Sequence, residues 1–174
     1  ISPDGAYMLY TSVKTDENTP RVPGIWLGDF EGEARRLCDG RRAAWQPGGK
    51  GFVFERDGRI FERAIEGAEE REVPVQKMTW PEYHPQGGFL LVGDSEPYLY
   101  RLHENGTLEK LIRTHGGPAR ISPDGRFVAL RLGPHIHVFD LETKETRQLT
   151  FQPGVQSYPV WSEDGRALCY VSSA

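Results

Sequence analysis

The side chains best suited to metal chemistry are three histidines in the second half of the sequence. His135 and His137 are one residue apart, and alternate residues of a strand point to the same face. His115 lies upstream of this pair, in a stretch with the glycine-rich composition of a loop. Imidazole nitrogens are common zinc ligands, so His115, His135 and His137 are the metal candidates. Because no Cys or Glu stands at ligand spacing beside them, we expect no metal and no other cofactor.

Motifs of covalent and phosphate chemistry are absent from the sequence. It contains no Gly-x-Ser-x-Gly nucleophile elbow, which a serine peptidase of the hydrolase type requires. No glycine-rich phosphate loop follows an apolar run. Asp4, Asp124 and Asp164 each stand in a turn sequence and do not form a pair of carboxylates. We therefore predict no catalytic residues, and a protein without enzymatic activity is favoured over an enzyme.

The three aspartates belong to a phrase that recurs along the chain. Ile121-Ser122-Pro123-Asp124-Gly125 is identical to the first five residues, and residues 161–165 differ from it at two places. Two weaker copies begin at Trp45 and Tyr83. The lead residues fall at positions 1, 45, 83, 121 and 161, so the successive steps are 44, 38, 38 and 40 residues. A period near forty is typical of propellers and other repeat architectures.

The recurring phrase has the composition of a tight turn. Proline presets φ, the aspartate side chain accepts local backbone hydrogen bonds, and glycine adopts the left-handed conformation that closes the turn. In the weaker copies Gly48 or Gln86 replaces the aspartate, so this side-chain bond is lost there. The predicted structural turn residues are Asp4, Gly5, Asp124, Gly125, Asp164 and Gly165.

Each repeat contains short runs with the composition of β-strands. An apolar run follows the phrase, an alternating run comes next, a charged run suits an outer edge, and a further run leads into the next phrase. The apolar runs are 7–10, 52–54, 89–92, 127–130 and 168–171, and the alternating runs are 25–30, 60–65, 98–102 and 135–141. The charged runs are 33–37, 69–73, 108–112 and 145–149, and the runs that lead into the next phrase are 42–45, 77–83, 118–121 and 157–161. Because no stretch has a helical period over three turns, the sequence predicts an all-β fold.

The amino-acid sequence of residues 147–150 and 158–172 resembles the WD40-like Pro-Asp repeat of TolB-type β-propellers. Similar blades occur in the propeller domains of prolyl-oligopeptidase-family and tricorn-type peptidases. The resemblance extends over the whole chain and is strongest in the first, fourth and fifth repeats. It implies a β-propeller of four-stranded antiparallel blades around a central channel. It implies no particular activity, because propellers host many.

The repeats divide the chain into 1–44, 45–82, 83–120, 121–160 and a partial 161–174. We therefore expect a single β-propeller domain or fragment over residues 1–174, with about four blades' worth of chain. TolB-type rings contain more blades than that. Terminal blades would leave apolar faces in water, so we expect either a larger ring, with the remainder of a longer chain, or completion by a second copy in a homo-oligomer.

The charge balance limits the classes of partner. The chain has 21 basic and 25 acidic residues and a net charge of −4, without a basic stripe, so nucleic acid is not an expected partner. No apolar run approaches the roughly 18 residues of a membrane span, and we predict no membrane insertion. The compartment stays open. A periplasmic location follows if the protein is TolB-like, and a cytoplasmic location fits the sequence equally well.

Binding residues are expected on the loops at one face of the propeller, because function concentrates on loops. The favoured function is a non-catalytic, TolB-like scaffold that binds a protein or peptide. Two alternatives stay open: the gating or substrate-positioning propeller of a larger serine peptidase of the prolyl-oligopeptidase type, and a metal-dependent propeller enzyme. The candidate binding residues are Asp16, Glu17, Arg21, His115, His135 and Tyr158.

Overall fold

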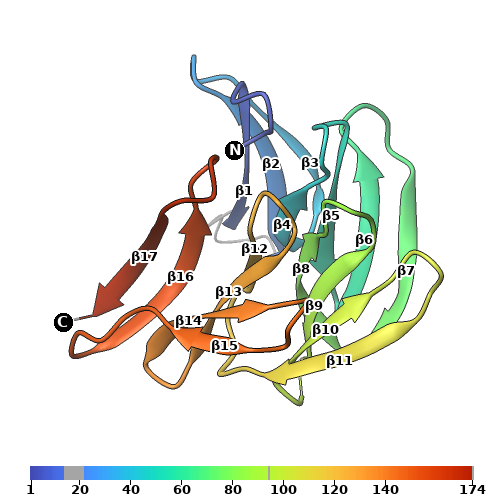
Figure 1. The fold of residues 1–174 in the computed structure, drawn as a ribbon. Coiled ribbons are helices and arrows are strands. Elements are labelled where there is room, and N and C mark those ends of the chain that lie inside the picture. Colours follow the sequence, from blue (N-terminus) through green and yellow to red (C-terminus); the bar gives the residue numbers. More distant parts are fainter. Residues whose placement is uncertain (14–21, 94, 174) are drawn as a thin grey trace. The chain divides into compact units, whose positions relative to one another are not determined.

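The computed structural model describes residues 1–13, 22–93 and 95–173 (Figure 1). All regular structure in these residues is β-strand, so the predicted all-β fold class is confirmed. The described part of the chain therefore offers no helix that could cross a membrane. The chain forms two compact units, with the boundary between Tyr83 and His84, and each is described by itself.

The first unit contains strands β1 to β8. Strands β1, β2 and β3 form a three-stranded sheet in that order, and β4 to β7 form a four-stranded sheet. Neighbouring strands are antiparallel, and β8 packs against β4 and β5. The strands are β1 (Tyr7–Val13), β2 (Pro23–Asp29), β3 (Ala34–Asp39), β4 (Arg41–Trp45), β5 (Gly51–Arg56), β6 (Arg59–Ala64), β7 (Glu70–Gln76) and β8 (Met78–Tyr83).

The second unit contains strands β9 to β17. Strands β9, β10 and β11 are antiparallel neighbours, β12 to β15 form a four-stranded sheet, and β16 pairs with β17. The strands are β9 (Phe89–Gly93), β10 (Tyr98–Leu102), β11 (Leu108–Arg113), β12 (Arg120–Ile121), β13 (Phe127–Leu132), β14 (His135–Asp140), β15 (Thr146–Gln148), β16 (Val155–Trp161) and β17 (Leu168–Ser173). The four-stranded antiparallel sheets confirm the predicted blade architecture.

The core of the first unit lies between its two sheets. Strand β5 is buried along nearly its whole length, and Phe52 and Phe54 are fully inaccessible to solvent. Their rings lie 5.4 Å apart and pack with Ile25 of β2. A strand covered on both faces reads as a continuous apolar run, which explains why β5 does not alternate. Each fully buried phenylalanine contributes roughly 1.5–3 kcal/mol.

The second unit repeats this pattern in its own central strands. Val128, Ala129 and Leu130 of β13 are all buried, as are Leu90 and Leu91 of β9. The strands after the second, third and fourth turn phrases, β5, β9 and β13, thus each contain a run of buried residues, whereas β1 after the first phrase is mostly exposed. In β17, which follows the last phrase, five of the six residues are exposed.

The serine and the aspartate of the turn phrase both hold the turn through side-chain hydrogen bonds. In the copy at 121–125, the Ser122 hydroxyl donates to Asp124 Oδ1 at 2.5 Å and accepts from the Phe127 amide at 2.9 Å. The Arg126 amide donates to the same aspartate oxygen at 3.1 Å. The bond from Ser122 and then the one from Arg126 lower the pKa of Asp124. Gly125 has a φ of 79°, in the left-handed region.

The same geometry occurs in the other two strong copies of the phrase. The aspartate oxygen accepts the serine hydroxyl at 2.5 Å in the copy at 1–5 and at 2.7 Å in the copy at 161–165. In each, the amide two residues after the aspartate donates to the same oxygen at 3.1 Å. The closing glycines, Gly5 and Gly165, have φ values of 74° and 68°. The pKa values of Asp4 and Asp164 are lowered, chiefly by these serine hydrogen bonds.

Candidate functional site

Half of the binding residues predicted from the sequence can be placed. Asp16, Glu17 and Arg21 lie outside the described residues. The remaining three, His115, His135 and Tyr158, belong to the second unit. They lie on different segments: His115 in the loop before β12, His135 at the start of β14, and Tyr158 within β16.

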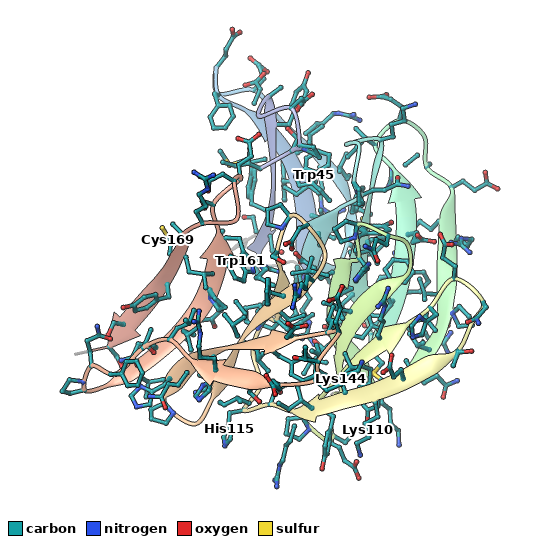
Figure 2. All side chains as sticks on the ribbon, in the orientation of Figure 1. Trp45, Lys110, His115, Lys144, Trp161 and Cys169 are labelled. Atoms are coloured by element: carbon teal, nitrogen blue, oxygen red, sulfur yellow. The ribbon has the colours of Figure 1, made fainter. Side chains whose placement is uncertain are left out.

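The three metal candidates have structural hydrogen bonds. The ring Nδ1 of His115, which is labelled in Figure 2, accepts a bond of 2.9 Å from the Gly133 amide. The Nδ1 of His137 lies 3.4 Å from the carbonyl oxygen of His135. Among the residues that the structure describes, no group of three or more His, Cys, Asp or Glu side chains converges as a metal site would require. The structure therefore does not bring the three histidines together as a ligand set.

His135 is held by Gln156, a residue that the sequence analysis did not single out. The Gln156 side chain is fully buried, and its Nε2 donates to the carbonyls of residues 152, 153 and 154 at 3.1–3.2 Å. These bonds fix the orientation of the amide, so its Oε1 faces His135 Nδ1 at 2.7 Å and accepts a hydrogen bond from the N–H there. Gln156 thereby fastens the loop that precedes β16.

Three of the four strands that lead into a turn phrase, β4, β8 and β16, have a strained backbone. Arg42, Trp80 and Tyr158 have φ values of 55°, 51° and 53°, in the region that favours glycine. All three stand at the same place of their repeats, three residues before the lead residue. The strand register shifts at this place in β4 and in β16. Such strain costs of order 1–3 kcal/mol and concentrates at functional sites. The side chains around these bulges are therefore candidates for a functional site.

In the first unit, two of these strained residues belong to one cluster of polar side chains. Glu55 Oε1 accepts from Arg41 Nε at 2.9 Å and from Arg41 Nη2 at 2.6 Å. Glu55 Oε2 accepts from Arg42 Nη1 at 2.6 Å and from the Thr79 hydroxyl at 2.5 Å. The Arg42 guanidinium lies 4.6 Å from the centre of the Trp80 ring. We call Arg41, Arg42, Glu55, Thr79 and Trp80 the arginine cluster.

The arginine cluster borders a small cleft of the first unit. Its volume is about 210 Å³, and its lining residues are Pro23, Gly40, Arg41, Glu55, Arg56 and Asp57. Gly40 is required there, because a Cβ at this position would lie 2.7 Å from the Phe54 ring. The Arg41 side chain is 51% exposed, whereas Glu55 beneath it is only 2% exposed. A buried carboxylate thus anchors an arginine that reaches solvent.

The arginine cluster offers fixed charges and hydrogen-bond donors. Burial alone would raise the pKa of Glu55, but hydrogen bonds from Thr79, Arg42 and Arg41 outweigh it and lower the pKa. The carboxylate therefore stays ionised, and the four hydrogen bonds that it accepts occupy its two oxygens. Guanidinium groups remain protonated in proteins. The arginine cluster can therefore bind a ligand by charge and hydrogen bonds, but it holds no group that readily exchanges a proton.

The arginine cluster is not apparent from the sequence. Its members come from β4, β5 and β8, in two successive repeats, so no local motif contains them. One signal was present: Arg42 and Trp80 occupy equivalent places of the repeat, as does Tyr158. Alignment of the repeats on the turn phrase brings these positions into one column.

Four-stranded antiparallel sheets in which sequence neighbours pair are typical of the blades of a β-propeller. Comparisons with family models and with curated proteins give no match. Solved structures do match. TolB from Acinetobacter baumannii superposes with a TM-score of 0.76 at 22% identity, over 96% of this chain and 46% of that chain. A protein assigned as TolB from Agrobacterium tumefaciens gives 0.67 at 20% identity, over 85% and 62%.

Two peptidases share the fold at lower identity. A prolyl endopeptidase matches with a TM-score of 0.64 at 14% identity, over 99% of this chain and 31% of that chain. The tricorn protease matches with a TM-score of 0.57 at 14% identity, over 84% and 17%. This chain spans less than two thirds of each of the four solved chains. The predicted resemblance to TolB-type and peptidase propellers is thus confirmed at the level of the fold.

Proposed function

We propose that this chain is a non-catalytic propeller scaffold that binds a protein or peptide segment at the arginine cluster. All members of the cluster except Glu55 lie on β4 and β8, each the strand that leads into a turn phrase. In a four-stranded blade this is the innermost strand, which faces the central channel of a propeller. A segment that enters the channel would therefore meet these side chains.

The observation that carries the proposal is the preorganisation of Arg42. Its backbone is held in a strained conformation, its Nη1 is bound to Glu55, and its guanidinium lies over the Trp80 ring. Immobilising a long side chain on binding costs about 0.5–1.5 kcal/mol. In Arg42 this cost has been met on folding, which favours a role in recognition.

A binding screen with matched variants tests the proposal. The labelled full chain is applied to an array of random short peptides, together with Arg42→Gln and Arg59→Gln. Arg59 has one ion pair, with Glu72 at 3.3 Å, and a 59% exposed side chain, so it serves as the control. We expect selective binding by the wild type and by Arg59→Gln, and loss of most signals in Arg42→Gln with the thermal transition retained. Identical patterns for all three proteins would contradict the proposal, as would the absence of any selective signal.

A separate observation supports a partner at the β16–β17 sheet. Cys169, labelled in Figure 2, is exposed, whereas the residues eight positions after the lead residue in the three preceding repeats are 0% exposed. Those residues are Val53, Leu91 and Ala129. Val160, which pairs with Cys169, is 54% exposed, and Val171 on the same face is 58% exposed. We propose that a further blade of the same type covers this face.

The further blade comes either from a second copy of the chain or from the remainder of a longer one, and light scattering separates the two. Association into a dimer that Val171→Lys converts to a monomer supports a homo-oligomer. A monomer that binds a dye for apolar surface supports completion by further sequence. A monomer that binds no dye at any concentration would show that the face is covered in another way, and would overturn this part of the proposal.

The fold shared with the prolyl endopeptidase and the tricorn protease supports a second candidate, the propeller that positions substrates for a peptidase. In this case too the arginine cluster would bind a peptide, but the complex would be transient. The two candidates differ in lifetime of the complex. Dissociation measured by stopped flow distinguishes a stable partner from a substrate in transit.

A further inference from the structure

We infer that the group recognised by the arginine cluster is a carboxylate of the bound segment. The inference rests on the proposed binding function, and it names the chemistry that the site selects. It follows from the hydrogen-bond capacity, the charge and the dimensions of the cluster.

The first step is the hydrogen-bond capacity of the two guanidinium groups. Each arginine has five N–H donors in a planar fork. Glu55 accepts one hydrogen bond from Arg41 Nε and one from Arg41 Nη2. From Arg42 it accepts a hydrogen bond of a single nitrogen, Nη1. No other hydrogen bond of these two side chains to a described residue occurs, apart from the bond of Arg42 Nη1 to Thr79. The Nη1 group of Arg41, on a side chain that is 51% exposed, is thus left to donate to a ligand.

The second step is the charge. Arg41 and Arg42 carry two positive charges against the one negative charge of Glu55, so the cluster keeps one unit of positive charge. Arg56 at the edge of the cleft is paired with Glu70 at 2.5 Å and adds little. Asp57 also lines the cleft and opposes an anion there. A carboxylate matches the planar fork of an arginine and gains charge-assisted bonds, and it is the anion that an unmodified protein or peptide segment carries.

The third step is size. The cleft of about 210 Å³ is smaller than the roughly 300–1,000 Å³ of pockets that enclose cofactors or drug-sized ligands. It suits one side chain or one chain end. The carboxylate could therefore belong to a Glu or Asp side chain or to the carboxyl terminus of the segment, and both present the same group to Arg41.

A peptide array with matched forms separates these sources. Each random peptide is printed with a central Glu and an amidated end, with a central Gln and an amidated end, and with a central Gln and a free carboxyl end. We expect at least one carboxylate form to bind about tenfold more tightly than the uncharged form, as is typical for hydrogen bonds to charged groups. The form that gains identifies the source.

Protein variants test the assignment to Arg41. Arg41→Gln is expected to abolish the preference for the carboxylate form, Asp57→Asn to increase it, and Arg59→Gln to leave it unchanged. If Arg41→Gln does not fold, Arg41→Lys keeps the charge without the fork and should reduce the preference. Added salt should weaken the carboxylate forms of the wild type more than the uncharged form.

The outcomes separate this inference from the proposed function. If all three forms bind equally well, the scaffold binds peptides but does not select a carboxylate, and the inference is wrong. If Arg41→Gln and Arg41→Lys both keep the full preference, another part of the chain reads the carboxylate, and the inference is equally wrong. If no form binds, the proposed function fails, and the inference fails with it.

Discussion

The guanidinium of Arg42 lies 4.6 Å from the centre of the Trp80 ring, and both residues have a left-handed backbone. The contact joins equivalent positions of two successive repeats. A stacked arginine over an indole contributes about 0.5–1 kcal/mol at an exposed site and more when it is desolvated. The backbone strain and the contact between guanidinium and indole therefore involve the same pair of residues. The strained positions of the repeats are accordingly the first to test by substitution.

Glycine and alanine substitutions at a bulge measure this strain. Tyr158→Gly and Tyr158→Ala remove the same side-chain contacts, but only alanine keeps the left-handed penalty of roughly 1–2 kcal/mol. After the greater flexibility of glycine in the unfolded chain is deducted, we expect the Gly variant to be about 1 kcal/mol more stable. Chemical denaturation gives both values. At Tyr98, which has no positive φ, the order should reverse. An alanine variant of Tyr158 at least as stable as the glycine variant would contradict the strain.

The anchor of the arginine cluster should be sensitive to truncation. Glu55→Ala leaves Arg41 and Arg42 without their shared acceptor, and breaking a buried ion pair costs about 3–5 kcal/mol. Glu72 is 43% exposed and pairs with Arg59, so Glu72→Ala should cost less than about 1 kcal/mol. Denaturant titration of the two variants checks the contrast. Equal losses would show that Glu55 is no more important than a surface acid.

Serine and aspartate of the turn phrase should act as one unit. Asp124→Ala and Ser122→Ala are each expected to lower the free energy of unfolding by about 1 kcal/mol through lost hydrogen bonds. Because the Ser122 hydroxyl donates to Asp124, the double variant should lose less than the sum of the single losses. A double-mutant cycle by denaturation measures the coupling. Unchanged midpoints for both single variants would contradict a structural role for this turn.

His84 gives the second unit a dependence on pH. It occupies the place of the serine in the third copy of the phrase, and its Nδ1 accepts from the Gln86 amide at 3.1 Å. Burial, and then the positive charge of Arg101, lower the pKa of His84, and His103 nearby acts in the same direction. The unfolded chain takes up a proton near pH 6.5 and the folded chain resists it, so stability falls as the pH decreases below about 6.5.

The variant His84→Ser restores the residue of the strong copies and removes this titration. We expect the stability of the wild type to fall more than that of His84→Ser when the pH is lowered from 7.5 to 5.5. Denaturation at the two pH values gives the difference. A parallel decline in both proteins would assign the pH dependence to other groups.

Local signals made the fold predictable. The turn phrase marks the start of each repeat, and the apolar runs after it follow from burial on both faces, as at Phe52 and Phe54. The arginine cluster was not predictable in this way. Glu55 is the residue after an apolar run, and its partners lie 13, 14 and 24 positions away. A single sequence does not reveal which of many charged residues a sheet will bury.

The loop residues preferred from the sequence illustrate the same limit. The sequence predicts a ligand or binding role for His135, because its residue type and its alternation with His137 suit a ligand or a binding surface. In the structure its Nδ1 is bound to Gln156, whose own role depends on three backbone carbonyls. Residue type alone could not separate a side chain that holds a loop from one that meets a partner.

The central claim is that the arginine cluster binds the segment. Nuclear magnetic resonance of the full chain, titrated with the tightest peptide of the array, tests it directly through the Nε–H signals of the arginines and the indole signal of Trp80. We predict that the signals of Arg41, Arg42 and Trp80 shift together with one dissociation constant, while that of Arg59 stays in place. Shifts confined to other residues, such as His115 and His135, with the three cluster signals unmoved at saturation, would contradict the account.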